Sequence, residues 1–206
     1  MKWVKYKQVI ENFFSLSILN ALNVLLPLVT LPYMLHVVGK ANYGAYSYVY
    51  AVVQYVILFS TYGFNFSATK QISLCRDDKE KVSKIYNAVT ASKTLIALSL
   101  SVLLLLCAKL VFKDGVGTLM FVYGLGMVIG DVLTPIWLFQ GMEKMKYMTI
   151  VNASSKILFT ILIFIVVRAS EDYQLLILLN SCGYLLAGLL SLILVCRQFH
   201  LRLHWA

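Results

Sequence analysis

Three charged side chains stand alone inside long apolar stretches of this sequence, namely Lys93, Asp131 and Lys156. An unpaired charge at the centre of a bilayer costs about 2.5–3.5 kcal/mol, so such residues form pairs or mark an ion or substrate pathway. Because one acid cannot neutralise two bases, one positive charge is left to attract an anionic group. Asp131 could bind a proton or a cation. The alternative is a structural ion pair of Asp131 with either lysine, which would only hold helices together.

Other residue types that could carry chemistry do so less well. Cys196, His200 and His204 are spaced four residues apart, but a rigid helix rarely places three ligands around one ion. Asp77 and Asp78 would suit magnesium only with a third acid, and Lys81 stands in its place. The membrane-facing loops lack a cluster of acids or histidines suited to metal or acid–base chemistry. The sequence therefore predicts no metal, no cofactor and no enzymatic activity.

The composition points to a membrane. Of 206 residues, 60% are hydrophobic and 13% are charged, whereas a soluble domain has about 45–50% apolar and 25% charged residues. The net charge of +9 does not indicate nucleic-acid binding. The basic residues lie mainly between the apolar segments, whereas a nucleic-acid-binding domain clusters them on one face. The four cysteines form no CxxC pair, so no disulfide framework is expected.

Six segments have the length and hydrophobicity of membrane-spanning helices. Backbone groups within hydrocarbon must be paired inside their own segment, so the fold class is an all-α, six-helix membrane bundle. Residues 1–12 are expected to form an amphipathic segment at the membrane surface, and residues 197–206 a cytoplasmic tail that is truncated. The predicted spans are 13–35, 43–67, 85–108, 116–140, 148–167 and 173–196.

The distribution of lysine and arginine between alternate loops predicts the orientation. One side carries 12 such residues and the other carries 4. Because cytoplasmic loops are enriched in Lys and Arg, both termini are expected in the cytoplasm. Counted from the cytoplasmic ends, the three buried charges lie nine or ten residues into their helices. At 1.5 Å per residue they share a level roughly 13–15 Å deep, near the midplane.

Polar residues recur at helical spacing on three of the predicted helices. Such stripes are explained either by hydrogen bonds between helices or by a water-filled lumen, and the stripes on the first two helices favour the lumen. The stripes are Asn20, Asn23, Pro27 and Thr30; Ser47, Tyr50, Gln54, Thr61 and Asn65; and Asn152, Lys156 and Thr160.

The predicted helix 116–140 contains two further features. Gly126 and Gly130 form a small-residue face that lets a neighbouring helix approach closely. Pro135 has no backbone N–H and so leaves the carbonyl of Asp131 without its helical partner, which permits a kink beside the buried acid.

Three stretches of the sequence resemble a known family. They are "PLVTLPYMLHVVGKANYGAYSYV" (27–49), with a proline pair and a Gly-x4-Gly turn; "YGFNFSATKQIS" (62–73); and "PIWLFQGMEKMKYMTIVNASSKI" (135–157). Together they resemble the polysaccharide or O-antigen flippases, Wzx-like members of the multidrug/oligosaccharidyl-lipid/polysaccharide exporter superfamily. The resemblance covers essentially the whole chain.

The resemblance implies a multi-pass protein of the bacterial inner membrane that moves a polyprenyl-diphosphate-linked oligosaccharide between leaflets during lipopolysaccharide and other surface polysaccharide biosynthesis. It also implies alternating access around a cationic cavity. Members have two six-helix lobes, and this sequence contains one, so the expected partners are a second lobe, the lipid-linked oligosaccharide and membrane lipids. The alternatives are a non-transporting lobe that binds or regulates a partner, and a peptidoglycan-precursor or multidrug exporter of the same superfamily.

We expect particular residues to carry this function. The prolines Pro27, Pro32 and Pro135 are candidates for gating, and Asp131 for binding the coupling ion. The expected substrate contacts are Lys93, Lys156, Asn20, Asn23, Gln54, Asn65 and Lys70.

Overall fold

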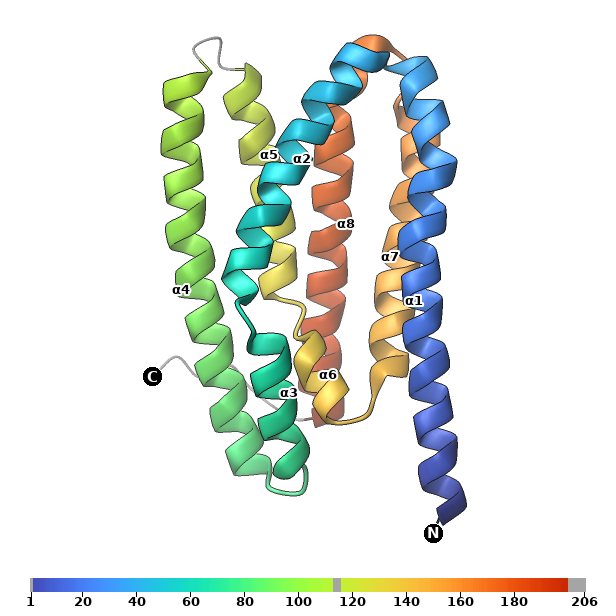
Figure 1. Cartoon of the computed structure of the whole chain (residues 1–206), viewed down its shortest axis with the longest axis vertical. Coiled ribbons are helices and arrows are strands. Elements are labelled where there is room, and N and C mark those ends of the chain that lie inside the picture. The colour runs from blue at the N-terminus through green and yellow to red at the C-terminus, as the bar shows by residue number, and fades with distance from the viewer. Residues whose placement is uncertain (1, 113–115, 200–206) are drawn as a thin grey trace.

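The chain folds into a bundle of long helices that run up and down its long axis (Figure 1). The computed structural model describes residues 2–112 and 116–199, and this part of the chain contains no strand. The helices are α1 (Lys2–Val37), α2 (Lys40–Thr61), α3 (Phe64–Leu74), α4 (Lys79–Val111), α5 (Val116–Val132), α6 (Ile136–Gly141), α7 (Met145–Val166), the 3-10 helix η1 (Ser170–Asp172), α8 (Tyr173–Leu194) and the π-helix η2 (Val195–Phe199).

Among the described residues, six segments are long and apolar enough to cross a membrane, which confirms the predicted all-α, six-span fold class. Their outward faces expose large apolar side chains such as Leu58 of α2 and Leu98 of α4, as expected for surfaces that contact lipid. The segments are Phe13–Val37, Lys40–Leu74, Lys79–Val111, Gly117–Gly141, Met145–Val166 and Ser170–Phe199.

The first segment is a single helix from Lys2 to Val37. Residues 2–12, predicted as a separate surface segment, continue into the span without a break. Pro27 and Pro32 both lie inside this helix and do not interrupt it.

The second and fourth segments are each divided in two. Between α2 and α3, Gly63 has a φ of 77°, a left-handed conformation that glycine adopts without steric cost. The predicted helix 43–67 is therefore interrupted at this point. Between α5 and α6 the chain leaves the helix just before Pro135, because proline cannot donate the hydrogen bond that would continue it. The predicted kink is thus a complete break, visible in Figure 1 between the yellow-green and gold helices.

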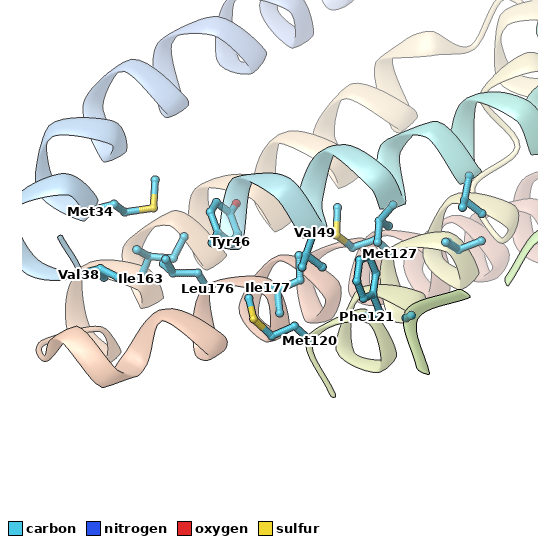
Figure 2. Packing of buried hydrophobic residues seen from close by; sticks show 14 of the residues in the cluster. Met34, Val38, Tyr46, Val49, Met120, Phe121, Met127, Ile163, Leu176 and Ile177 are labelled. Carbon is cyan, nitrogen blue, oxygen red and sulfur yellow. The ribbon is translucent and has the colours of Figure 1, made fainter. Parts of the chain in front are cut away.

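One apolar cluster joins α2, α5 and α8 (Figure 2). Its centre includes the fully buried Val53, Met127 and Ile177. α5 packs most extensively against α8, and a Cβ atom on Gly130 would lie only 2.3 Å from the carbonyl carbon of Tyr184. The backbones of the two helices are therefore in direct contact, which confirms the predicted close approach along the Gly126–Gly130 face.

A second apolar cluster joins α3, α4, α6 and α7 at the end of the bundle where α1 begins. Trp137, Leu138 and Phe139 from "PIWLFQG" are almost completely buried in it. The hydroxyl of Thr69 on α3 donates to the carbonyl of Trp137 across 3.2 Å. The apolar half of this motif is therefore core, and it fixes α6 against α3.

The charged half of the same motif forms the turn into α7. Glu143 has a φ of 55°, and the Lys144 amide donates to the Phe139 carbonyl at 2.8 Å, which is the pattern of a Schellman cap. The Glu143 carboxylate lies 2.7 Å from the Arg76 guanidinium. This ion pair joins the α6–α7 turn to the α3–α4 connection, and both lie at the same end of the bundle as the start of α1 (Figure 1).

Candidate functional site

A cavity of about 910 Å³ lies between the α1–α7 pair and the α2–α8 pair. α1 packs chiefly against α7 and makes little contact with α2, which leaves room between the two pairs. All four stripe residues predicted on the first helix line the cavity, as do all three predicted on 148–167. Of the stripe on 43–67, Ser47 and Tyr50 line it. The stripes on the first helix and on 148–167 therefore face one common space, together with the first two residues of the stripe on 43–67.

Lys156 supplies a positive charge to this cavity. It lies about halfway along α7, and its ammonium donates a hydrogen bond to the side-chain oxygen of Asn23 on α1. Both residues line the cavity. Within residues 2–112 and 116–199, no carboxylate forms an ion pair with Lys156. Its hydrogen-bond partner is therefore a neutral amide, and its positive charge is not neutralised by direct contact with a carboxylate of the described residues.

Ser155, the neighbour of Lys156, adds an unusual hydroxyl. The residue is 2% exposed, and its oxygen has no hydrogen-bond partner among the described residues. Buried polar atoms are almost always paired, so this unpaired oxygen, which is itself closed off from the cavity, is an exception. Ser155 lines the same cavity as Lys156.

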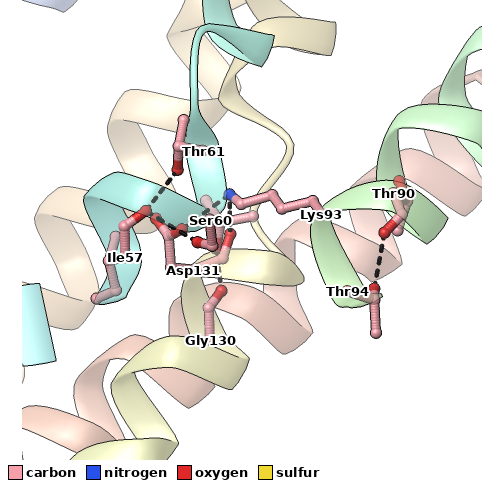
Figure 3. A network of polar contacts seen from close by, with 9 residues as sticks. Ile57, Ser60, Thr61, Thr90, Lys93, Thr94, Gly130 and Asp131 are labelled. Carbon is pink, nitrogen blue, oxygen red and sulfur yellow. Dashed lines mark hydrogen bonds and ion pairs between the residues drawn. The ribbon is translucent and has the colours of Figure 1, made fainter. Parts of the chain in front are cut away.

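Lys93 and Asp131 form a buried pair at the α5–α6 break (Figure 3). The Lys93 ammonium lies 2.8 Å from the Asp131 carboxylate and donates to the main-chain carbonyl of the same residue at 3.0 Å. This is the carbonyl that Pro135 deprives of its helical donor. It also accepts from the Thr134 amide at 3.2 Å. One lysine thus satisfies both the charge and the backbone group exposed by the break.

The ion pair separates the roles of the two lysines. Lys93 is 4% exposed and does not belong to the cavity wall, whereas Asp131 does. The sequence allowed Asp131 to pair with either Lys93 or Lys156, and in the structure it pairs with Lys93. Lys156 is consequently the cation left over.

The remaining predicted contact residues lie apart from the cavity. Gln54 donates to the Tyr184 hydroxyl at 3.2 Å and is not part of the lining. Asn65 and Lys70 are on α3, beyond the break at Gly63, and do not line the cavity either. Pro27 does line it. The structure therefore gathers Asn20, Asn23 and Lys156 but not the other four predicted contacts.

Comparison with known proteins gives the family. Residues 9–206 match the model of a family described as "Polysaccharide biosynthesis protein". The chain belongs to this family. No solved structure matches the chain.

Two curated relatives of the chain are named "Putative O-antigen transporter". The protein of Escherichia coli (strain K12) is 33% identical over 188 residues, which are 91% of this chain and 45% of that protein. The protein of Shigella dysenteriae is 28% identical over 186 residues, which are 90% of this chain and 46% of that protein. The chain therefore spans about half the length of the relatives it matches. Both names describe transport and neither describes an enzyme.

The other sequence candidates for chemistry have structural roles or fall outside the described residues. Asp78 caps α4 by accepting the Lys81 amide at 3.1 Å, and this bond with the nearby Lys81 ammonium holds the pKa of the carboxyl below its ordinary value. His200 and His204 of the cysteine–histidine set lie outside the described residues. Among residues 2–112 and 116–199, no three metal-binding side chains gather at one point.

Sequence reasoning missed part of the cavity wall. Tyr43 and Tyr46 of α2, and Asn180 and Tyr184 of α8, all line the cavity. The signal for the tyrosines was present, because Tyr43, Tyr46 and Tyr50 share one helical face. Asn180 and Tyr184 are also one turn apart in segment 173–196, which contains no charged residue. The spacing of these residues within α2 or within α8 does not by itself predict which other helix or cavity the polar face contacts.

Proposed function

We propose that this chain is one six-helix lobe of a transporter that moves a polyprenyl-diphosphate-linked oligosaccharide across the bacterial cytoplasmic membrane. The observation that carries the proposal is Lys156, a cation in the wall of a large cavity within a membrane bundle. No acid among the described residues forms an ion pair with it. A diphosphate is the anionic part of such a lipid. The family match and the names of the two relatives support a role in the assembly of surface polysaccharides.

The proposal includes an orientation. The loops at the end of the bundle where α1 begins belong to the side with 12 lysines and arginines. The Arg76–Glu143 ion pair joins two of these loops, in agreement with their common side. By the positive-inside rule this end faces the cytoplasm, and the cavity-lining start of α2 lies toward the outer leaflet.

A transport cycle needs a cavity that faces the two leaflets in turn. We propose that a second six-helix lobe covers the open side of the cavity and that the two lobes rock against each other around Lys156. Asp131 is suited to bind a coupling proton or cation, because its carboxylate touches both the cavity and Lys93. Loss of its negative charge would release the Lys93 ammonium at the α5–α6 break.

The test is transport by the chain reconstituted in proteoliposomes. The probe is a fluorescent polyprenyl-diphosphate oligosaccharide, and the readout is its access to an impermeant glycosidase outside the vesicle. Lys156→Gln is expected to weaken lipid binding about 10-fold or more, since a hydrogen bond to a charged group contributes about 1.5–3 kcal/mol. Lys109→Gln is the matched control, because Lys109 is exposed in the last turn of α4.

The outcomes separate the proposed function from its alternatives. Movement of the lipid with an unchanged covalent structure supports a transporter, whereas chemical conversion of the probe identifies an enzyme. A wild-type chain that binds the lipid and does not move it, even when a second six-helix lobe is reconstituted with it, is a binding or regulatory lobe. Equal binding by wild type and Lys156→Gln would remove the cation from the mechanism.

A further inference from the structure

A row of aromatic side chains lines the side of the cavity opposite Lys156. Tyr43, Tyr46 and Tyr50 lie on one face of α2, and all three border the cavity. The ring centroids of Tyr43 and Tyr46 are 5.8 Å apart, and so are those of Tyr46 and Tyr50. With a rise of 1.5 Å per residue the row extends about 10 Å along the helix. It forms a continuous aromatic strip.

Neutral polar groups from α8 hold this strip and add hydrogen-bonding capacity. The Asn180 amide donates to the Tyr46 hydroxyl at 3.1 Å and to the Leu176 carbonyl at 2.8 Å. These bonds use its nitrogen, so the amide oxygen stays without a partner among the described residues. An amide oxygen accepts hydrogen bonds. Asn180 therefore offers an acceptor next to the aromatic strip.

The two walls of the cavity differ in chemistry. The α1–α7 wall has a cation and an amide. The α2–α8 wall has aromatic faces and neutral polar groups, which suit a ligand that is apolar on its faces and rich in hydroxyls at its edges. A pyranose ring has this character, whereas a diphosphate requires the cation.

We propose that the face formed by Tyr43, Tyr46, Tyr50 and Asn180 binds the sugar part of the transported lipid, while Lys156 and Asn23 bind its diphosphate. This assignment rests on the proposed function and adds the residues that determine sugar specificity. The strip runs from the level of Lys156 toward the α1–α2 connection. The oligosaccharide thus extends from the diphosphate toward the end of the bundle away from the start of α1.

The test compares two lipids on the purified chain in nanodiscs. One probe is polyprenyl diphosphate without sugar, and the other is the same lipid with its oligosaccharide. Tyr43→Leu is expected to weaken binding of the sugar-bearing lipid about 10-fold, the size of one or two aromatic contacts, and to leave the sugar-free lipid unchanged. Tyr50→Leu should behave in the same way. Lys156→Gln should weaken the binding of both lipids.

Three comparisons make the outcome decisive. Tyr55→Leu is the matched control, because Tyr55 lies on the same helix, is 60% exposed and does not border the cavity. Tyr43→Phe keeps the aromatic face and should keep most of the sugar-dependent binding, which a general folding defect would not. An equal loss for both lipids in the two Leu variants, or no loss for either lipid, overturns the sugar assignment alone. Failure of the wild-type chain to bind either lipid overturns the proposed function itself.

Discussion

Removal of the Lys93 ammonium should destabilise the bundle strongly, because it leaves the Asp131 carboxylate without its cation. Lys93→Met keeps the length and packing of the side chain and deletes its charge. The side chain is 5% exposed, and its partner Asp131 is 19% exposed. Breaking a buried pair by removal of one member costs about 3–5 kcal/mol. Since Asp131 retains some contact with the cavity, the lower end, about 3 kcal/mol, is expected.

The loss of the bond to the main-chain carbonyl of Asp131 adds little to this figure. That carbonyl still accepts the Thr134 amide at 3.2 Å, so the backbone group does not become fully unsatisfied. The dominant cost is the carboxylate left without its cation. Asp131→Asn should therefore reduce the damage when it is combined with Lys93→Met, because the double variant has no charge left at the break.

The assay is reversible unfolding in mixed detergent micelles, with both single variants and the double variant forming a thermodynamic cycle. We expect a coupling free energy of about 2 kcal/mol or more between the two residues. Lys84→Met is the matched control on the same helix. Its ammonium lies 2.7 Å from the Glu80 carboxylate, but the two side chains are 75% and 79% exposed, so no measurable loss is expected.

Two results would refute this reasoning. Additive single variants would show that the 2.8 Å contact does not couple Lys93 to Asp131 energetically. A loss for Lys84→Met as large as that for Lys93→Met would show that removal of a lysine from α4 is harmful regardless of burial. Either result would also weaken the proposed link between the charge of Asp131 and the α5–α6 break.

Two further predictions address packing and orientation. Gly130→Ala should lower the free energy of unfolding by about 2 kcal/mol, because its Cβ would lie 2.3 Å from the Tyr184 carbonyl. Gly44→Ala is the control, because no atom lies within 4 Å of a Cβ at that position. It should leave the free energy of unfolding unchanged or raise it by up to about 1 kcal/mol. Unfolding in micelles measures both, and equal losses would contradict the direct backbone contact. In a cysteine-free background, Ser170→Cys should react with an impermeant maleimide on intact cells, whereas Asp77→Cys should react only after lysis. The reverse labelling would show that the orientation inferred from the basic residues is wrong.

Much of the fold follows from local features of the sequence. Six apolar segments of sufficient length predict six spans, since each must pair its backbone groups internally. Pro135 predicts a kink next to Asp131 because its missing N–H acts within one turn, and the structure has a complete break there. The interruption at Gly63 was not predicted. A single glycine is compatible with a continuous helix, and the left-handed conformation at this position depends on how α3 packs against α4 and α6.

The sequence by itself predicted that two bases and one acid lie at a similar depth in the membrane, because each is nine or ten residues from the cytoplasmic end of its predicted helix. The tertiary structure alone decided that Asp131 pairs with Lys93 and that Lys156 faces the cavity with Asn23. It also decided that a row of tyrosines forms the opposite wall. These facts depend on which helices are neighbours and on the rotation of each about its axis. The choice of neighbouring helices and the rotation of each helix are fixed by contacts between distant segments, such as the close approach of α5 and α8 at Gly130. The spacing of residues along one helix cannot predict such contacts.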